Sequence, residues 1–254
     1  MALERLRRWV WAPRPVPLVY DGSRIWLLAT SDIERRYRVR NADKEPWTIE
    51  WLHSSLQPGE VLYDIGANVG VFSLVGARAA RGVRVVAFEP GFANYARLCE
   101  NIQLNDCGNQ VTALPWLLAD REGMRTFTYR STEPGQSRHE MSLDEPAAMP
   151  PSPDAITQQM AAIALDTAVE RFGLPVPHHI KLDVDGAEAL VLIGAAATLR
   201  GTQLRSVLVE ANAATGDEVT ALLSAAGLRL VSTAVRDKAG APWYGVFQRS
   251  PAAP

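Results

Sequence analysis

The sequence has little of several features that would direct a protein to a special environment. Its 254 residues include two cysteines, Cys99 and Cys107, which are too few for a disulfide framework or a cysteine-based metal site. The net charge is −2, so no basic field favours nucleic acid as a partner. No apolar run approaches the length of a bilayer-spanning helix, and we expect no integral membrane segment.

The first twenty residues carry several arginines and then prolines, without a long apolar segment or a small-residue cleavage site. We therefore expect a surface helix or docking arm there, and a cytoplasmic protein. Residues 1–59 as a whole are expected to be an N-terminal extension that packs on a main domain formed by residues 60–254. The oligomeric state stays open, a homo-oligomer included.

From residue 60 onward, short apolar runs alternate with longer amphipathic ones. This alternation predicts right-handed βαβ units and a parallel sheet. The expected strands cover residues 60–66, 84–90, 110–118, 179–186 and 205–211. The expected helices cover residues 69–82, 92–105 and 187–201. Two further runs, LRLVST and PWYGVFQR, have the pattern of a closing antiparallel pair.

Residues 119–160 interrupt this alternation. Their first part indicates a turn followed by another strand, and residues 131–158 concentrate proline, serine and charge without periodicity. We expect a hairpin and a lid-like insertion in this part of the chain.

Carboxylates stand at the expected carboxyl ends of four strands, namely Asp64, Glu89, Asp183 and Glu210. Ligands of open parallel sheets bind beyond these ends. Glu89 lies 23 residues after Gly66, close to the spacing at which a second-strand acid accepts hydrogen bonds from an adenosine ribose. Capping of the helix that follows is the alternative role for Glu89.

The stretch YDIGANVGVFSL, residues 63–74, distinguishes two classes of cofactor. Gly66 and Gly70 permit a tight turn and a close approach, whereas a dinucleotide loop would need a further glycine where Val71 stands. Asp64 would repel a pyrophosphate but suits the ammonium group of an amino acid. Asn68 tolerates a left-handed turn and can offer its amide to a carboxylate. The loop therefore favours S-adenosylmethionine, and an NAD(P)-dependent oxidoreductase is the alternative.

Leu117 and Leu118 are expected to form an apolar wall against the adenine ring. The complete set of expected cofactor residues is Asp64, Gly66, Ala67, Asn68, Gly70, Ser73, Glu89, Pro90, Leu117 and Leu118.

Five stretches together resemble the FkbM family of S-adenosylmethionine-dependent methyltransferases: VLYDIGANVGVFSL, VVAFEPGFANYARLCENIQLN, IALDTAVERFG, HIKLDVDGAEALVLIGAAATL and SVLVE. They occur in order between about residues 45 and 211. The resemblance implies a class I methyltransferase fold, a doubly wound α/β sheet of seven strands with the last one antiparallel and helices on both faces. It also implies O-methylation of a hydroxyl on a sugar, glycan or polyketide-type natural product. Asp185 departs from the family, which more often has glutamate there.

Methyl transfer to an alcohol needs a base that removes the hydroxyl proton. Asp183 is our first candidate, with helix capping as its alternative role. Lys181 points to the same face and needs a carboxylate partner, for which Asp183 and Glu210 are the candidates. Glu210 is either a second catalytic carboxylate or part of a salt bridge. His139 is a further candidate base, with a plain surface residue as the alternative.

No metal is expected, although Asp183, Asp185 and Glu188 form an acidic group that could hold Mg²⁺. His178 and His179 precede a strand at its amino end, the wrong edge of the sheet for chemistry, and are expected to be structural. A catalytically inactive module that binds the cofactor is the remaining alternative for the whole protein.

Overall fold

The computed structural model describes residues 15–20, 23–137, 139–142, 155–235 and 242–250. Much of the expected N-terminal surface helix, and the proline-rich centre of the expected lid, lie outside these residues. No helix in the described ranges combines the length and the apolarity that crossing a bilayer requires.

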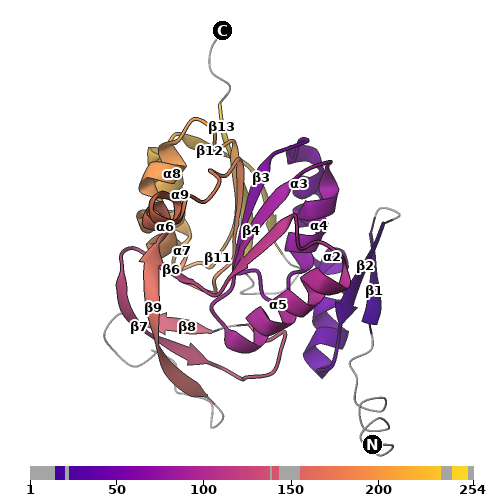
Figure 1. Cartoon of the computed structure of the whole chain (residues 1–254). Coiled ribbons are helices and arrows are strands. Elements are labelled where there is room, and N and C mark those ends of the chain that lie inside the picture. The colour runs from indigo at the N-terminus through magenta and orange to yellow at the C-terminus, as the bar shows by residue number, and fades with distance from the viewer. Residues whose placement is uncertain (1–14, 21–22, 138, 143–154, 236–241, 251–254) are drawn as a thin grey trace, which may run out of the picture.

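A seven-stranded sheet forms the centre of the molecule, and its strand order is β12-β13-β11-β10-β3-β4-β5. β13 runs antiparallel to the other six strands, which are parallel to one another. This confirms the predicted doubly wound fold (Figure 1). The strands are β3 (Val61–Ile65), β4 (Arg84–Phe88), β5 (Val111–Leu114), β10 (His179–Leu182), β11 (Ser206–Ala211), β12 (Leu228–Val235) and β13 (Trp243–Arg249).

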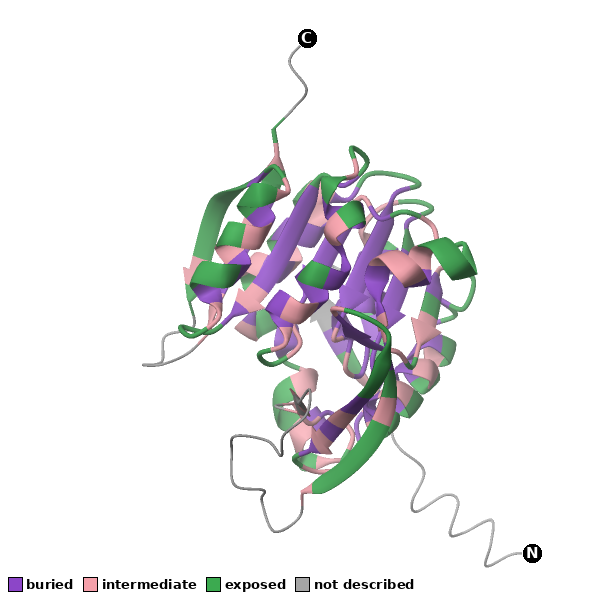
Figure 2. Cartoon of the chain, turned by 90° about the vertical axis from the view of Figure 1, so that its left-hand side faces the viewer, coloured by how far each residue is buried: buried purple, intermediate pink, exposed green. Residues whose placement is uncertain are grey.

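Helices cover both faces of this sheet and enclose two apolar cores (Figure 1). One face carries α3 (Pro46–Ser55), α4 (Val71–Ala79) and α5 (Phe92–Leu104). The other face carries α6 (Leu165–Phe172), α7 (Glu188–Gly194), α8 (Ala196–Arg200) and α9 (Gly216–Ala225). Every residue of β3 is buried, which explains why its sequence is an apolar run without alternation. Burial of the strands between the helical layers is visible in Figure 2.

The topological switch point lies between β3 and β10. The chain proceeds from β3 outward through β4 to β5, and it later starts again at β10 and proceeds the other way to β11. A crevice forms beyond the carboxyl ends of strands at such a point, and ligands bind there.

A second, four-stranded sheet lies beside the main one, with the order β6-β9-β7-β8 (Figure 1). Its strands are β6 (Leu117–Ala119), β7 (Gly123–Tyr129), β8 (Glu140–Ser142) and β9 (Ile156–Ala164). The expected single strand over residues 110–118 is therefore wrong. Pro115 cannot donate to a strand ladder, so β5 ends at Leu114, and β6 pairs in parallel with β9 instead.

Two other expected elements are shorter than the sequence predicts. The strand expected over residues 179–186 ends at Leu182, because Asp185 and Gly186 adopt left-handed conformations in the following turn. The helix expected over residues 187–201 is divided into α7 and α8 at Ala195.

The N-terminal segment contributes β1 (Pro15–Tyr20), β2 (Ser23–Leu28), η1 (Glu34–Arg38) and α2 (Asn41–Lys44). Asn101 of α5 and Asn105, which caps the end of α5, bind the edge of β2, because their side chains accept the Leu28 and Trp26 amides at 2.8 Å. Their side chains thus replace a neighbouring strand.

Arg97 of α5 anchors η1 through a buried ion pair with Glu34. The same guanidinium donates to the Leu28 carbonyl and to the Thr30 hydroxyl, and the other Glu34 oxygen accepts the Ser31 amide. The pair is therefore embedded in hydrogen bonds, as a buried charge pair must be to remain stable.

We predict that Arg97→Met lowers the free energy of unfolding by about 3–5 kcal/mol, because Glu34 keeps a buried charge without its partner. Arg36→Met is the matched control, since Arg36 and Asp32 form an ion pair whose side chains are both more than 70% exposed. Its loss should cost less than about 1 kcal/mol. Urea denaturation measures both, and equal effects would contradict the anchoring role of Arg97.

Candidate active site

A pocket lies beyond the carboxyl ends of β3, β4 and β10. Ligands of open parallel sheets bind at this edge. The second sheet forms one of its walls. The lining residues include Arg38, Gly66, Asn68, Glu89, Pro90, Trp116, Leu117, Leu118, Phe127, Ser137, His139, Met141, Asp183 and Asp185.

The loop after β3 packs directly on the end of β10. Gly66 has φ +80°, and a Cβ there would lie 1.8 Å from the Asp183 carbonyl oxygen. The amides of Gly66 and Ala67 both donate to the Phe88 carbonyl at the end of β4. The loop is thus fixed to both neighbouring strands, and only glycine satisfies the conformation and the space at residue 66.

Asn68 is left-handed, with φ 52°, which confirms the conformation predicted for it. Its amide N–H donates to Glu89 Oε2 at 2.8 Å, and its side-chain Nδ2 donates to the Gln136 carbonyl at 2.7 Å. Asn68 therefore connects the glycine loop to two other segments of the pocket wall. Its contact with a cofactor carboxylate stays a prediction.

Glu89 follows β4, lines the pocket and is 4% exposed. Both carboxylate oxygens accept backbone N–H groups, Oε2 from Asn68 and Oε1 from Gly91 at 2.8 Å. Burial raises the pKa of Glu89 to about 7, although these hydrogen bonds and the charge of Arg38 oppose the shift. Glu89 is thus a carboxyl group that changes charge near neutral pH.

Lys181 lies beneath the pocket between two carboxylates. Its Nζ is 3.3 Å from Asp183 Oδ2 and 3.5 Å from Asp64 Oδ1, and the side chain is 2% exposed. Burial alone would lower the pKa of Lys181, but Asp183 and Asp64 raise it above its ordinary value. Lys181 is therefore a permanent ammonium group that orients Asp183.

Asp64 is completely buried, and its Oδ2 accepts the Ser73 hydroxyl at 2.6 Å. It does not line the pocket. The structure gives Asp64 a role in balancing Lys181, and its contact with a cofactor ammonium group stays a prediction.

Residues 133–137, which we call the strap, contact the glycine loop through Gln136 and reach the pocket at Ser137. The Gln136 carbonyl accepts both Asn68 and Asn94, at 2.7 and 3.0 Å. The Gly135 amide donates to Asn94 Oδ1 at 2.8 Å, and the Gly135 carbonyl accepts Arg38 Nε at 2.7 Å. The strap therefore joins η1 to the glycine loop and α5.

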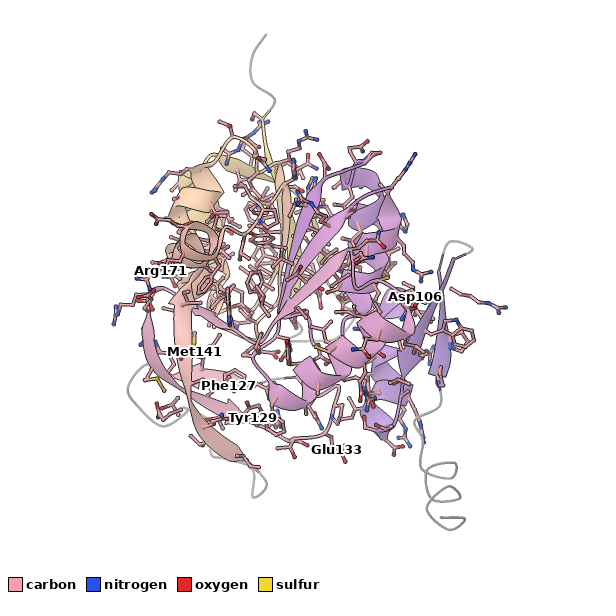
Figure 3. The ribbon with its side chains drawn as sticks, in the orientation of Figure 1. Asp106, Phe127, Tyr129, Glu133, Met141 and Arg171 are labelled. Carbon is pink, nitrogen blue, oxygen red and sulfur yellow. The ribbon has the colours of Figure 1, made fainter. Side chains whose placement is uncertain are left out.

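The wall that the second sheet contributes to the pocket is aromatic. Phe127 and Tyr129 of β7 lie 4.9 Å apart between ring centroids, and the His139 ring is within 5.6 Å of both; Figure 3 labels Phe127, Tyr129 and Met141 on this second sheet. Burial, with a contribution from Arg38, lowers the pKa of His139 to about 4, so the imidazole is neutral at pH 7. Its Nδ1 is buried without a hydrogen-bond partner in the described ranges.

The structure divides the residues predicted for the site into two groups. Those that line the pocket are Gly66, Asn68, Glu89, Pro90, Leu117, Leu118, His139 and Asp183. Those that lie outside its lining are Asp64, Ala67, Gly70, Ser73, Lys181 and Glu210. Sequence reasoning missed the lining residues Arg38, Trp116, Phe127 and Met141, for which no motif or spacing gave a signal.

The remaining polar candidates have structural surroundings. His179 lies between Ser206 at 2.7 Å and Glu60 at 3.1 Å, in keeping with a structural role. Glu188 is buried, and its Oε1 accepts the Gly186 amide at 2.9 Å. No group of three or more His, Cys, Asp or Glu side chains that could hold a metal ion is found among the residues that the structure describes.

We predict that Gly66→Ala destabilises the protein by about 1–3 kcal/mol more than Gly59→Ala does. Both glycines have φ near +80°, so both variants carry the same left-handed backbone cost of about 1–2 kcal/mol. Only at Gly66 does the new methyl group meet the Asp183 carbonyl, since nothing lies within 4 Å at Gly59. Urea denaturation of the two variants measures the difference, and equal unfolding energies would contradict the close approach.

Comparison with solved structures confirms the fold. A SAM-dependent methyltransferase from Agrobacterium tumefaciens superposes with a TM-score of 0.56 over 93% of this chain and 70% of that chain, at 12% identity. Magnesium protoporphyrin IX methyltransferase from Synechocystis PCC 6803, solved with bound SAM, gives a TM-score of 0.53 over 98% of this chain and 92% of that chain, at 13% identity.

Sequence relatives give the same class. Methyltransferase sdnD of Sordaria araneosa is 28% identical and covers 70% of this chain and 75% of that protein. The hexuronic acid methyltransferase AglP of Haloferax volcanii is also 28% identical, over 77% of this chain and 74% of that protein. The 31-O-demethyl-FK506 methyltransferase FkbM of Streptomyces tacrolimicus is 26% identical, over 70% of this chain and 75% of that protein. The model of the methyltransferase FkbM domain matches residues 64–230, and the chain therefore belongs to the FkbM family of S-adenosylmethionine-dependent methyltransferases.

Proposed function

We propose that this protein transfers a methyl group from S-adenosylmethionine to a hydroxyl of a sugar, glycan or polyketide-type natural product. The observation that carries the proposal is the position of Asp183, whose half-buried carboxylate lines the pocket while its backbone contacts the glycine loop. Relatives named for hexuronic acid and for 31-O-demethyl-FK506 support the acceptor class.

The residues of the pocket fit the cofactor. Gly66 lines the pocket without a side chain because it packs on the Asp183 carbonyl, and the Glu89 carboxylate is suited to the ribose hydroxyls. Trp116, Leu117 and Leu118 offer an apolar surface for the adenine. When bound, the cofactor supplies an electrophilic methyl group on a sulfonium.

Asp183 is the proposed base. O-methylation requires the hydroxyl oxygen to be held in line with the methyl group while its proton is removed. Lys181 donates to Asp183 Oδ2 from below at 3.3 Å and so fixes the direction of the carboxylate. Because Lys181 stays protonated, it cannot itself take the proton.

His139 is the second candidate base. Its Nδ1, which has no hydrogen-bond partner in the described ranges, and its neutral ring are compatible with accepting a proton. However, His139 lies against the aromatic wall of β7, whereas Asp183 adjoins the glycine loop. We therefore assign His139 to holding the acceptor.

The acceptor would lie between an apolar and a polar surface. Phe127 and Met141 can pack against carbon atoms, while Ser137, His139 and Asp183 can bind hydroxyl groups. A hydroxylated ring or polyketide chain has both kinds of surface.

The direct test is incubation with methyl-labelled cofactor and a panel of uronic acids, glycosides and hydroxylated polyketides, followed by mass spectrometry. Saturable cofactor binding without any labelled product would instead favour an inactive binding module.

We predict that Asp183→Asn reduces turnover of a methylated acceptor by about 10²–10⁴-fold, the usual contribution of a general base. The dissociation constant of S-adenosylhomocysteine, measured by calorimetry, should stay within about threefold of the wild-type value. His139→Gln is the comparison and should act mainly on the KM of the acceptor. Unchanged turnover in Asp183→Asn, together with a large loss in His139→Gln, would assign the base to His139.

We predict that the affinity for S-adenosylhomocysteine rises about tenfold between pH 6 and pH 8, because ionised Glu89 accepts hydrogen bonds from both ribose hydroxyls and the protonated form does not. The pKa of Glu89 near 7 places the change in this interval, with weaker binding on the acidic side. Glu89→Gln should bind more weakly at pH 8 and lose this pH dependence. A variant that keeps the same pH profile would exclude Glu89 as its source.

A further inference from the structure

Arg38 reaches the pocket from η1, outside the motifs that carry the family resemblance. Its Nε donates to the Gly135 carbonyl at 2.7 Å, which fixes the plane of the guanidinium. The two terminal nitrogens have no hydrogen-bond partner in the part of the chain that the structure describes. A guanidinium carries five N–H donors, so Arg38 has four left for a ligand.

Four carboxylates act on Arg38 through their charge. Burial lowers the pKa of Arg38, and the charges of Asp183, Asp185, Glu45 and Glu89 oppose that shift. Within the described ranges neither Asp183 nor Glu89 comes within 4 Å of its nitrogens to form an ion pair. The guanidinium remains protonated and is available to an anion that enters the pocket.

Arg38 is the single cation among the described lining residues at neutral pH. The other basic residue of the lining is His139, and its pKa near 4 makes it neutral. The lining otherwise carries the carboxyl groups of Glu89, Asp183 and Asp185. A ligand carboxylate would be repelled by these groups unless a cation offset them.

Arg38 lies on the side of the pocket that is furthest from the surface suited to adenine. Gln136, the strap residue next to Gly135, accepts a hydrogen bond from Asn68 of the glycine loop after β3, and Arg38 lines the pocket together with Asp183 and Asp185 beyond β10. The apolar surface that suits adenine begins at Trp116, after β5, three strands away from β10. Arg38 therefore lies at the β3–β10 side, where the part of the cofactor furthest from adenine must lie.

We propose that Arg38 binds the carboxylate at the methionine end of S-adenosylmethionine. The planar fork of the guanidinium matches the two oxygens of a carboxylate, which a lysine ammonium would not. The strap binds Arg38 through Gly135 and Asn68 through Gln136. In the proposed complex, η1 and the glycine loop therefore contact the same end of the cofactor. This role concerns the cofactor alone and does not depend on which acceptor is methylated.

The test uses S-adenosylhomocysteine and its decarboxylated analogue, which keeps the adenosine, the thioether and the amino group. Titration calorimetry of the wild-type protein should show about 10- to 100-fold tighter binding of the form with the carboxylate. Arg38→Gln should lose this factor for S-adenosylhomocysteine and leave the affinity for the analogue unchanged. Arg38→Lys should recover part of it. Arg36→Gln, an exposed change on the same element, is the matched control and should bind both ligands as the wild type does.

Three results would overturn the proposal. The first is a wild-type protein that binds both ligands equally, a result that needs no variant. The second is an equal loss of affinity for both ligands in Arg38→Gln, which would indicate that Arg38 acts only by holding Gly135. The third is unchanged affinity with a higher acceptor KM, which would assign Arg38 to an acidic group of the acceptor.

Discussion

A buried ammonium group holds the two central strands together at the point where the site forms. Lys181 of β10 lies opposite Asp64 of β3 in the register of the sheet, and its Nζ is within 3.5 Å of both Asp64 and Asp183. Burying any one of these charges alone would be costly, whereas together they offset one another. Because removal of any one leaves the others uncompensated, the residues at these three positions depend on one another. The direction of Asp183 into the pocket is a consequence of this pairing.

The glycine loop depends on the same residues, because it packs on the backbone of Asp183. Gly66 rests on the Asp183 carbonyl, so the loop cannot move away from β10 without losing its support. Asn68 of the loop donates hydrogen bonds to Glu89 and to the Gln136 carbonyl of the strap, and Arg38 donates to the neighbouring Gly135 carbonyl. Four segments that are distant in the sequence thus form one hydrogen-bonded unit beside the pocket.

The sequence predicted the parts of this unit that local patterns specify. Apolar strands, glycines at turns and strand-end acids recur at fixed spacing, so β3, the glycine loop, Glu89 and Asp183 were all placed at the right edge of the sheet. Arg38 was missed because its contact with Gly135 spans 97 residues, and nothing in ERRYR distinguishes one arginine from the next. The second sheet was missed for a related reason, since its parallel pairing of β6 with β9 is a long-range contact. Asp64 shows a different limit of prediction from sequence. The motif identifies the residue, but it does not reveal that the side chain is buried beneath the pocket and is absent from its lining.

The different surroundings of the acids explain how one acidic edge can serve a cationic cofactor. A sulfonium loses its charge during transfer, so an ionised acid packed against it would stabilise the ground state more than the transition state. Asp64 is neutralised beneath the sheet surface by Lys181, and Glu89 is bound on both oxygens by backbone N–H groups. Asp183, 26% exposed, is the carboxylate that Lys181 supports from below and that also opens into the pocket. Under the proposed function, negative charge is thus balanced beneath the loop and at the ribose end, and it is available where a proton has to be accepted.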